Sequence, residues 1–420
     1  MEEFEPGHRD GASEKQVKRE VLRFEEMQEG KRMHFFDMLT LDDIYYWYFE
    51  NNRMVDALKV VDYCLERHPS NDEFHYRKAT VFFDLGNLED AQTALEKALA
   101  FNPSSGEYRF LFAEILSLSG EYESAIEEMQ KVLVNCDDPG EIYYQMGLIG
   151  QMAGEDAEAE KYFRLAIEAE PGFEAAAAEL SFLCEGAGNF SEAVSIYEKL
   201  LDELPFSYYG WFNLSALYSR IGSPDLGLDA IEYSLAINED FSPAWYRKGL
   251  CLKALSRYDE AIQCFLESSL GERQNLSVWY NIGECYEKLE NLPLARKYFL
   301  KCTRISPEQP ESWSRLGSVL GKEEKYIEAI HFYRKGLEFT RDPFDIWLGL
   351  AMCEYRLGNP VSASEALEKA IFLNPHDVRL WRDWSHILAE EGNLEGACQF
   401  LQEGMRSNPA MSELYYLIGT

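Results

Sequence analysis

Residues 279–307 read WYNIGECYEKLENLPLARKYFLKCTRISP. Trp279, Ile282 and Gly283 are spaced three and four residues apart or side by side, so they share one face of a helix. Pro293 suits the first turn of a second helix, because proline lacks only an N–H that has no partner there. Pro307 ends that second helix. The stretch therefore predicts a pair of helices.

The same pattern recurs every 34 residues, which is a signature of a repeat array. With Trp279 as position 4 of its unit, position 20 is alanine in ten of eleven units and glycine in the other. Position 32 is proline in seven units. Six units have tryptophan at position 4: Trp211, Trp245, Trp279, Trp313, Trp347 and Trp381. Eleven complete units follow one another over 38–411 without an insertion.

This pattern resembles the tetratricopeptide repeat family. The family has tryptophan at position 4, glycine at 8, alanine at 20, phenylalanine at 24 and proline at 32. The resemblance implies an all-α fold, in which antiparallel helices A and B of each unit stack into a right-handed superhelical solenoid. Such a chain has no single core, because each unit buries its apolar face against its neighbours.

The ends of the chain lie outside the eleven units. Over 1–37 we expect a disordered leader and then an amphipathic helix, capped by Ser13. Val17, Val21, Phe24 and Met27 would cover the first unit, since solenoid ends need a cap. The final stretch, SELYYLIGT over 412–420, predicts a partial twelfth repeat or a cap helix. Its exposed apolar residues would favour self-association.

The turn between helices A and B has its own signal. A glycine at position 15 suits the left-handed residue that ends many helices. Seven units have it: Gly86, Gly120, Gly154, Gly188, Gly222, Gly358 and Gly392.

The composition is strongly acidic, with a formal net charge of −34. This charge argues against nucleic-acid binding, including an RNA-binding helical repeat, because phosphates require a basic surface. Residues 101–200 hold 20 acids and 5 bases, whereas residues 251–350 hold 15 and 14. The acidic part should attract cationic partners. Solubility of a long array accounts for the charge equally well.

The sequence offers no catalytic, cofactor or metal motif. The nine cysteines have no metal-ligand spacing, and Cys251, Cys285 and Cys353 all fall at position 10, where other units have apolar residues. The segment from Gly317 to Lys322 is one residue short of a phosphate loop. No apolar run is long enough for a membrane helix, and the N-terminus has no secretory signal. We expect a non-enzymatic cytoplasmic protein without cofactors.

Function in such arrays is expected on the concave surface, which the resemblance assigns to positions 2, 5, 9, 12 and 13 of helix A. Aromatic side chains there can hold an extended peptide at a small entropy cost. The alternative is that they support packing. The candidates are Tyr76, Phe110, Tyr144, Phe212, Tyr246 and Tyr280 at position 5, Phe83 at position 12 and Phe182 at position 9.

Charges on the same stripe differ along the chain. The early units have acids at these positions, namely Glu73, Glu107, Glu141, Glu114 and Asp84. These acids favour a basic segment of a partner. In the last units, Arg356, Arg379 and Arg382 could hold a carboxylate. Such cations could instead stabilise helix C-termini. The lysine–asparagine clamp of chaperone-binding family members is not reproduced.

The fifth unit interrupts the aromatic series with alanines from Ala175 to Ala178 and with Gly186. Closer stacking of units and a notch for a bulky partner side chain both fit this pattern. We therefore expect a scaffold that binds extended peptide segments in a concave groove. The alternative is an accessory or regulatory arm of a larger enzyme or of a secretion or assembly complex.

Overall fold

The computed structural model describes residues 14–134, 136, 138–270, 275–340, 343–390 and 392–407. Within these residues it contains 23 helices and no strand. The chain divides into two structural units of several repeats each, Met1–Glu203 (the first unit) and Leu204–Thr420 (the second unit). The predicted helix cap Ser13 and the predicted element over 412–420 lie outside the described residues.

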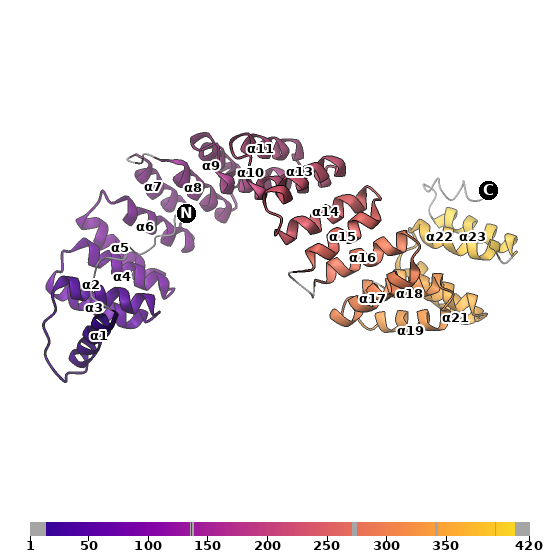
Figure 1. Cartoon of the computed structure of the whole chain (residues 1–420), viewed down its shortest axis with the longest axis horizontal. Coiled ribbons are helices and arrows are strands. Elements are labelled where there is room, and N and C mark those ends of the chain that lie inside the picture. The colour runs from indigo at the N-terminus through magenta and orange to yellow at the C-terminus, as the bar shows by residue number, and fades with distance from the viewer. Residues whose placement is uncertain are drawn as a thin grey trace. The chain divides into compact units, whose positions relative to one another are not determined.

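The first unit consists of consecutive helices, each packed on the next (Figure 1). They are α1 (Glu14–Gln28), α2 (Met38–Glu50), α3 (Met54–Arg67), α4 (Asp72–Asp84), α5 (Leu88–Phe101), α6 (Gly106–Leu118), α7 (Tyr122–Leu133), α8 (Gly140–Ala153), α9 (Asp156–Ala169), α10 (Glu174–Gly186) and α11 (Phe190–Glu203).

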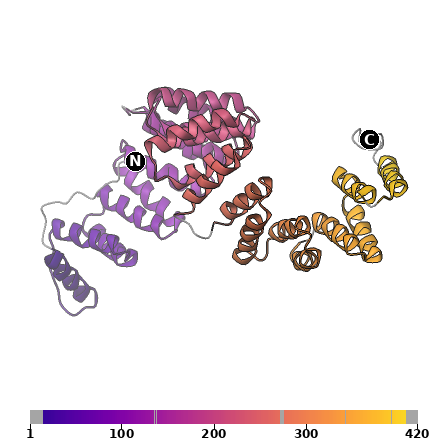
Figure 2. The same cartoon turned by 45° about the vertical axis from the view of Figure 1, so that its right-hand side comes forward.

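The second unit continues the same arrangement, which Figure 2 shows from another direction. Its helices are α12 (Tyr208–Arg220), α13 (Pro224–Ile237), α14 (Ser242–Ala254), α15 (Tyr258–Ser268), α16 (Leu276–Lys288), α17 (Leu292–Ile305), α18 (Pro310–Lys322), α19 (Tyr326–Gly336), α20 (Phe344–Arg356), α21 (Pro360–Leu373), α22 (Val378–Glu390) and α23 (Leu394–Ser407). The predicted all-α architecture of paired helices is confirmed. Even-numbered helices are the A helices, and odd-numbered helices from α3 onward are the B helices.

Each A helix ends in a residue with left-handed backbone geometry at position 15. All seven predicted glycines have positive φ angles. In the remaining four repeats the same conformation is adopted by Asn52, Ser256, Glu290 and Glu324, with φ between 57° and 61°. A non-glycine residue is disfavoured there. The packing of the two helices therefore fixes the turn even where the residue does not favour it.

Small residues at position 8 make room for an aromatic ring at position 24 of the same repeat. A Cβ atom on Gly249 would lie 2.6 Å from the ring of Phe265, and one on Gly283 would lie 2.9 Å from Phe299. Tyr333 fits against Gly317 of its own repeat and also against Gly349 of the next repeat. Glycine at these positions is thus required by close packing of the helices.

Tryptophans at position 4 also join successive repeats through hydrogen bonds. The indole N–H of Trp313 donates to the carbonyl of Pro307 over 2.7 Å, and that of Trp381 donates to the carbonyl of Pro375 over 2.9 Å. These carbonyls come just after a B helix and have no helical partner. The pattern residues therefore satisfy polar backbone groups as well as filling the core.

Helix α1 packs on the first helix pair. Val21 and Phe24 are buried in one cluster with Ile44 and Tyr48 of α2. The face of α2 that would otherwise be open is thus covered by apolar side chains. We propose that α1 is the N-terminal cap that a repeat array requires.

Candidate peptide-binding surface

The A-helix face is defined here as the side chains at positions 2, 5, 9, 12 and 13 of the A helices, taken separately in each unit. In the first unit most of its aromatic side chains are half-buried. Tyr76 stacks on Tyr108 of the next A helix, with ring centroids 4.7 Å apart. Tyr144 lies against Phe163 and Phe173, at 5.9 and 5.1 Å. These position-5 rings support packing and leave only part of each ring for a partner.

Phe182 on α10 differs from these rings because 68% of it is exposed. Gly186, further along the same helix, has no atom within 4 Å of the place where a Cβ would lie. The end of α10 therefore presents an exposed aromatic ring close to an open backbone. Phe83 and Phe110, in contrast, are only partly accessible and pack against the core.

Two carboxylates on this face, Asp84 of α4 and Glu114 of α6, make no ion pair with any described residue. Both reach solvent. Loss of hydration raises the pKa of Asp84, and it also raises the pKa of Glu114, to which the negative charge of Asp84 adds. Glu73 of the same face is instead neutralised by Arg77, at 3.0 Å. Asp84 and Glu114 are thus acidic groups to which a cation would bind favourably.

In the second unit the position-5 aromatics are also half-buried. Phe212 lies edge-on to Phe241, with centroids 5.2 Å apart. The hydroxyl of Tyr246 accepts a hydrogen bond from Asn281 over 3.0 Å, and that of Tyr280 accepts one from Arg315 over 3.2 Å. The predicted aromatic series is therefore tied to the scaffold by polar partners at position 6 of the next A helix.

Position 6 was not identified from the sequence as part of the face, yet its arginines reach the preceding A helix. Arg315 lies 2.8 Å from Glu284 and 3.7 Å from Glu287. Arg247 lies over the ring of Phe212, with its guanidinium carbon 4.5 Å from the centroid. Its Nε atom is buried and has no hydrogen-bond partner. The signal that would have found this position is the arginine that recurs there in three units.

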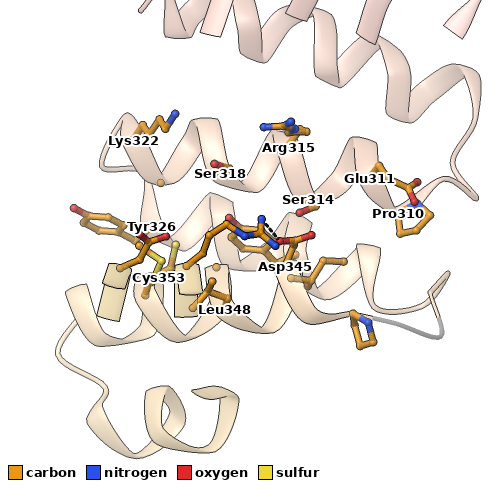
Figure 3. A pocket seen from close by; sticks show the side chains of 18 of the residues that line it. Pro310, Glu311, Ser314, Arg315, Ser318, Lys322, Tyr326, Asp345, Leu348 and Cys353 are labelled. Carbon is orange, nitrogen blue, oxygen red and sulfur yellow. Dashed lines mark ion pairs between the residues drawn. The ribbon is translucent and has the colours of Figure 1, made fainter. Parts of the chain in front are cut away.

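A cavity of about 600 Å³ opens on the A-helix face between α18 and α20 (Figure 3). Arg315 and Lys322 extend from α18, and Asp345 and Leu348 belong to α20. Its charged groups are largely paired. Lys322 lies 2.7 Å from Glu287 in the preceding A helix. The cavity therefore combines apolar walls with cations and acids that largely neutralise each other.

Family comparisons agree with this geometry. Models described as tetratricopeptide repeat match residues 76–139, 140–173, 242–268, 276–309 and 310–343. The chain belongs to the tetratricopeptide repeat family. The matched segments lie in both units of this tetratricopeptide repeat protein and include six of its helix pairs.

Several solved structures are similar to this chain at low sequence identity. YrrB, described as a TPR protein with an unusual peptide-binding site, is 21% identical over 44% of this chain and 96% of its own, with a TM-score of 0.39. The Cut9–Hcn1 hetero-tetramer of APC/C gives 14% identity, 97% and 98% coverage, and a TM-score of 0.43. Yeast Tom70 is 15% identical over 91% of this chain and 94% of its own, with a TM-score of 0.41. These similarities are too distant to carry a functional argument. No curated protein matches the sequence.

The three arginines predicted to hold a carboxylate each have an acidic partner in this tetratricopeptide repeat array. Arg379 lies 2.8 Å from Asp345 and 2.7 Å from Asp377, and Arg382 lies 2.9 Å from its neighbour Asp383. Arg356 pairs with Glu390. Arg356 and Arg379 line the cavity between α18 and α20, and Arg382 is not among its lining residues. A carboxylate from a partner would therefore compete with resident acids.

The described part of the tetratricopeptide repeat chain has no helix long and apolar enough to cross a membrane. Among the same residues, no cluster of three or more histidine, cysteine, aspartate or glutamate side chains could hold a metal ion.

Proposed function

We propose that this protein is a non-catalytic scaffold that binds extended segments of partner proteins on its A-helix face. We further propose that the first unit selects basic segments. The observation that carries this proposal is the pair of carboxylates, Asp84 and Glu114, that have no cation beside them.

Physical chemistry supports a cationic ligand at these two groups. Each carboxylate has lost part of its hydration, and the two repel each other. A guanidinium between them would supply hydrogen bonds and remove the repulsion. The nearby half-buried rings of Tyr76 and Phe110, and the exposed ring of Phe182 further along, provide flat apolar surface for the rest of a segment. We expect Arg-rich segments that contain an aromatic residue to bind best.

The experiment compares a synthetic Arg-rich peptide with the same peptide in which glutamate replaces arginine, by fluorescence anisotropy at low salt. We expect Asp84→Asn/Glu114→Gln to weaken binding of the basic peptide about tenfold, because two charge-assisted contacts are lost. The matched control is Glu89→Gln/Glu123→Gln, which removes the same charge from exposed positions on α5 and α7. Equal losses in both variants, or preference for the glutamate peptide, would exclude the proposed site.

The pH dependence of the same binding gives a second readout. Since folding raises the pKa of Asp84 and Glu114, both protonate at a higher pH than free carboxyl groups, whose pKa is about 4. As the pH is lowered, affinity for the Arg-rich peptide should therefore begin to fall while the pH is still above the pKa of a free carboxyl group. The Asp84→Asn/Glu114→Gln variant should lack this early loss.

We also propose a reducing compartment. All nine cysteines are free thiols. Burial raises the pKa of Cys64 and Cys285 to about 11 and that of Cys302 and Cys353 to about 12. Such thiols behave as inert apolar side chains. This supports the cytoplasm as the location.

A further inference from the structure

A second cavity, of about 680 Å³, lies between the B helices α17 and α19. Its floor consists of apolar side chains from the A helices, including Trp279, Leu316 and Leu320, of which at most 8% is exposed. Phe332 of α19 forms a further wall. None of these residues belongs to the A-helix face, so this cavity is separate from the surface proposed above.

Four cations of α17 surround this cavity: Arg296, Lys297, Lys301 and Arg304. Helix α17 contains no acidic residue. Arg296 lies 3.4 Å from Glu323, but the other three make no ion pair with any residue that the structure describes. The ammonium of Lys301 lies over the ring of Trp279, 2.9 Å from its centroid. A chain with a net charge of −34 thus concentrates unpaired positive charge beside an apolar cavity.

Helix α9 shows that this arrangement is not a general property of the repeat. It has the same Lys-Tyr-Phe sequence at positions 22 to 24 as α17. There, Lys161 lies 3.1 Å from Glu158, and Arg164 lies 2.6 Å from Glu160. In α17 the positions of these two acids are occupied by a leucine and an arginine. The acids that neutralise α9 from within the helix are therefore missing from α17, and Glu328 of α19 is the one acid among the residues described as lining the cavity.

The charges also restrict what could bind here. A nucleic acid or an anionic membrane would bring a long polyanion close to a chain that is strongly acidic as a whole, and would be repelled. A short acidic segment of a protein can stay close to the four cations of α17, which outnumber the single lining acid, Glu328. An apolar side chain within it would reach the floor at Trp279 and displace water from it.

We propose that the cavity between α17 and α19 binds an acidic segment of a partner protein, with an aromatic or aliphatic side chain over Trp279 and carboxylates on Lys297, Lys301 and Arg304. This site goes beyond the proposed function, because it takes ligands of the opposite charge on other helices. The protein would then hold two kinds of segment at separate places.

The test uses a fluorescent synthetic peptide of aspartate and glutamate residues around one central phenylalanine. We expect it to bind the full chain, and Lys297→Gln/Lys301→Met/Arg304→Gln to weaken binding at least about tenfold. Methionine at 301 keeps the side-chain stem over Trp279. Because Lys297 and Arg304 are exposed, the double variant Lys297→Gln/Arg304→Gln keeps the test valid if the triple variant misfolds.

Three controls test whether binding of the acidic peptide depends on this cavity. Lys161→Gln/Arg164→Gln in α9 removes paired cations from equivalent surface and should leave binding unchanged. A peptide with serine in place of phenylalanine should bind more weakly. Asp84→Asn/Glu114→Gln should bind the acidic peptide normally. The basic-peptide site at Asp84 and Glu114 and the acidic-peptide site at α17 are therefore tested independently, and either proposal can fail without the other. Unchanged binding in the α17 variants would overturn the proposal. So would self-association of the protein that the same variants abolish, since the occupant would then be a second copy.

Discussion

Two arginines, Arg247 and Arg315, occupy position 6 of different repeats in the second unit, yet their surroundings differ. Both have lost hydration through burial, which lowers an arginine pKa. Around Arg315 a hydrogen bond to Tyr280 and the charges of Glu284 and Glu287 outweigh that loss, so its pKa is raised. Arg247 has no such acids, so its pKa is lowered.

The difference comes from two side chains on the preceding A helix. Where Arg315 meets Glu284 and Glu287, the corresponding positions before Arg247 hold Ala216 and Ser219. The helix pairs place both arginines alike, and positions 9 and 12 of the neighbouring repeat decide whether the charge is paired. Each repeat thus sets the electrostatics of the next, while its own backbone remains unchanged.

The largest effect should follow from making Arg315 resemble Arg247. Glu284→Gln/Glu287→Gln removes the acids that also pair with Lys253 and Lys322. The four ion pairs are partly buried, so we expect a loss of about 2 kcal/mol in the free energy of unfolding. Urea denaturation followed by circular dichroism measures it. The control, Glu311→Gln, removes an exposed acid from α18. If Glu284→Gln/Glu287→Gln loses no more stability than this control, the comparison is contradicted.

A smaller effect, which destabilises at Arg315 but not at Arg247, is expected when each arginine is replaced by methionine. Arg315→Met leaves two acids without that partner and should cost about 1 kcal/mol. Arg247→Met removes an unpaired, partly dehydrated charge, although it also loses the contact with Phe212. We expect this change to be neutral or to stabilise by up to about 1 kcal/mol. Equal destabilisation by both substitutions would show that packing, and not charge pairing, distinguishes the two sites.

The smallest effect should come from supplying the missing acid. Ala216→Glu puts a carboxylate at the position that Glu284 has relative to Arg315. We expect about 0.5 kcal/mol of stabilisation, since such a pair remains partly solvated. A double-mutant cycle with Arg247→Met isolates the pair, because the gain should vanish when the arginine is absent. A gain that persists in Arg247→Met would reject a charge interaction.

The fold could be predicted because its pattern residues recur at fixed positions of the repeat, where many of them contact each other. Glycine at position 8 and an aromatic ring at position 24 touch each other in the same helix pair, as Gly283 and Phe299 do. The left-handed turns at Ser256, Glu290 and Glu324 could not be read from the residue types, since these residues disfavour that conformation. There, the tertiary packing of the two helices outweighs the local preference.

The candidate site was harder to predict, because several of its charges pair across repeats. Arg356 and Glu390 are 34 residues apart, and Lys322 and Glu287 are 35 apart. A stripe of arginines considered within single repeats looks available, whereas spacings of 34 and 35 reveal the acids that neutralise it. The aromatic residues at position 5 could be located from the sequence because they recur at the 34-residue spacing in six of the repeats, and their role in binding stays a prediction.

The ring-against-glycine packing restricts how such a chain can change in length. Tyr333 touches glycines of two successive A helices, so a single inserted residue within a pair would move the ring off both of them. Whole blocks of 34 residues, by contrast, bring their own ring and their own glycine. Growth or shortening of the array is therefore stepwise, and the number of docking positions for partners changes by entire modules.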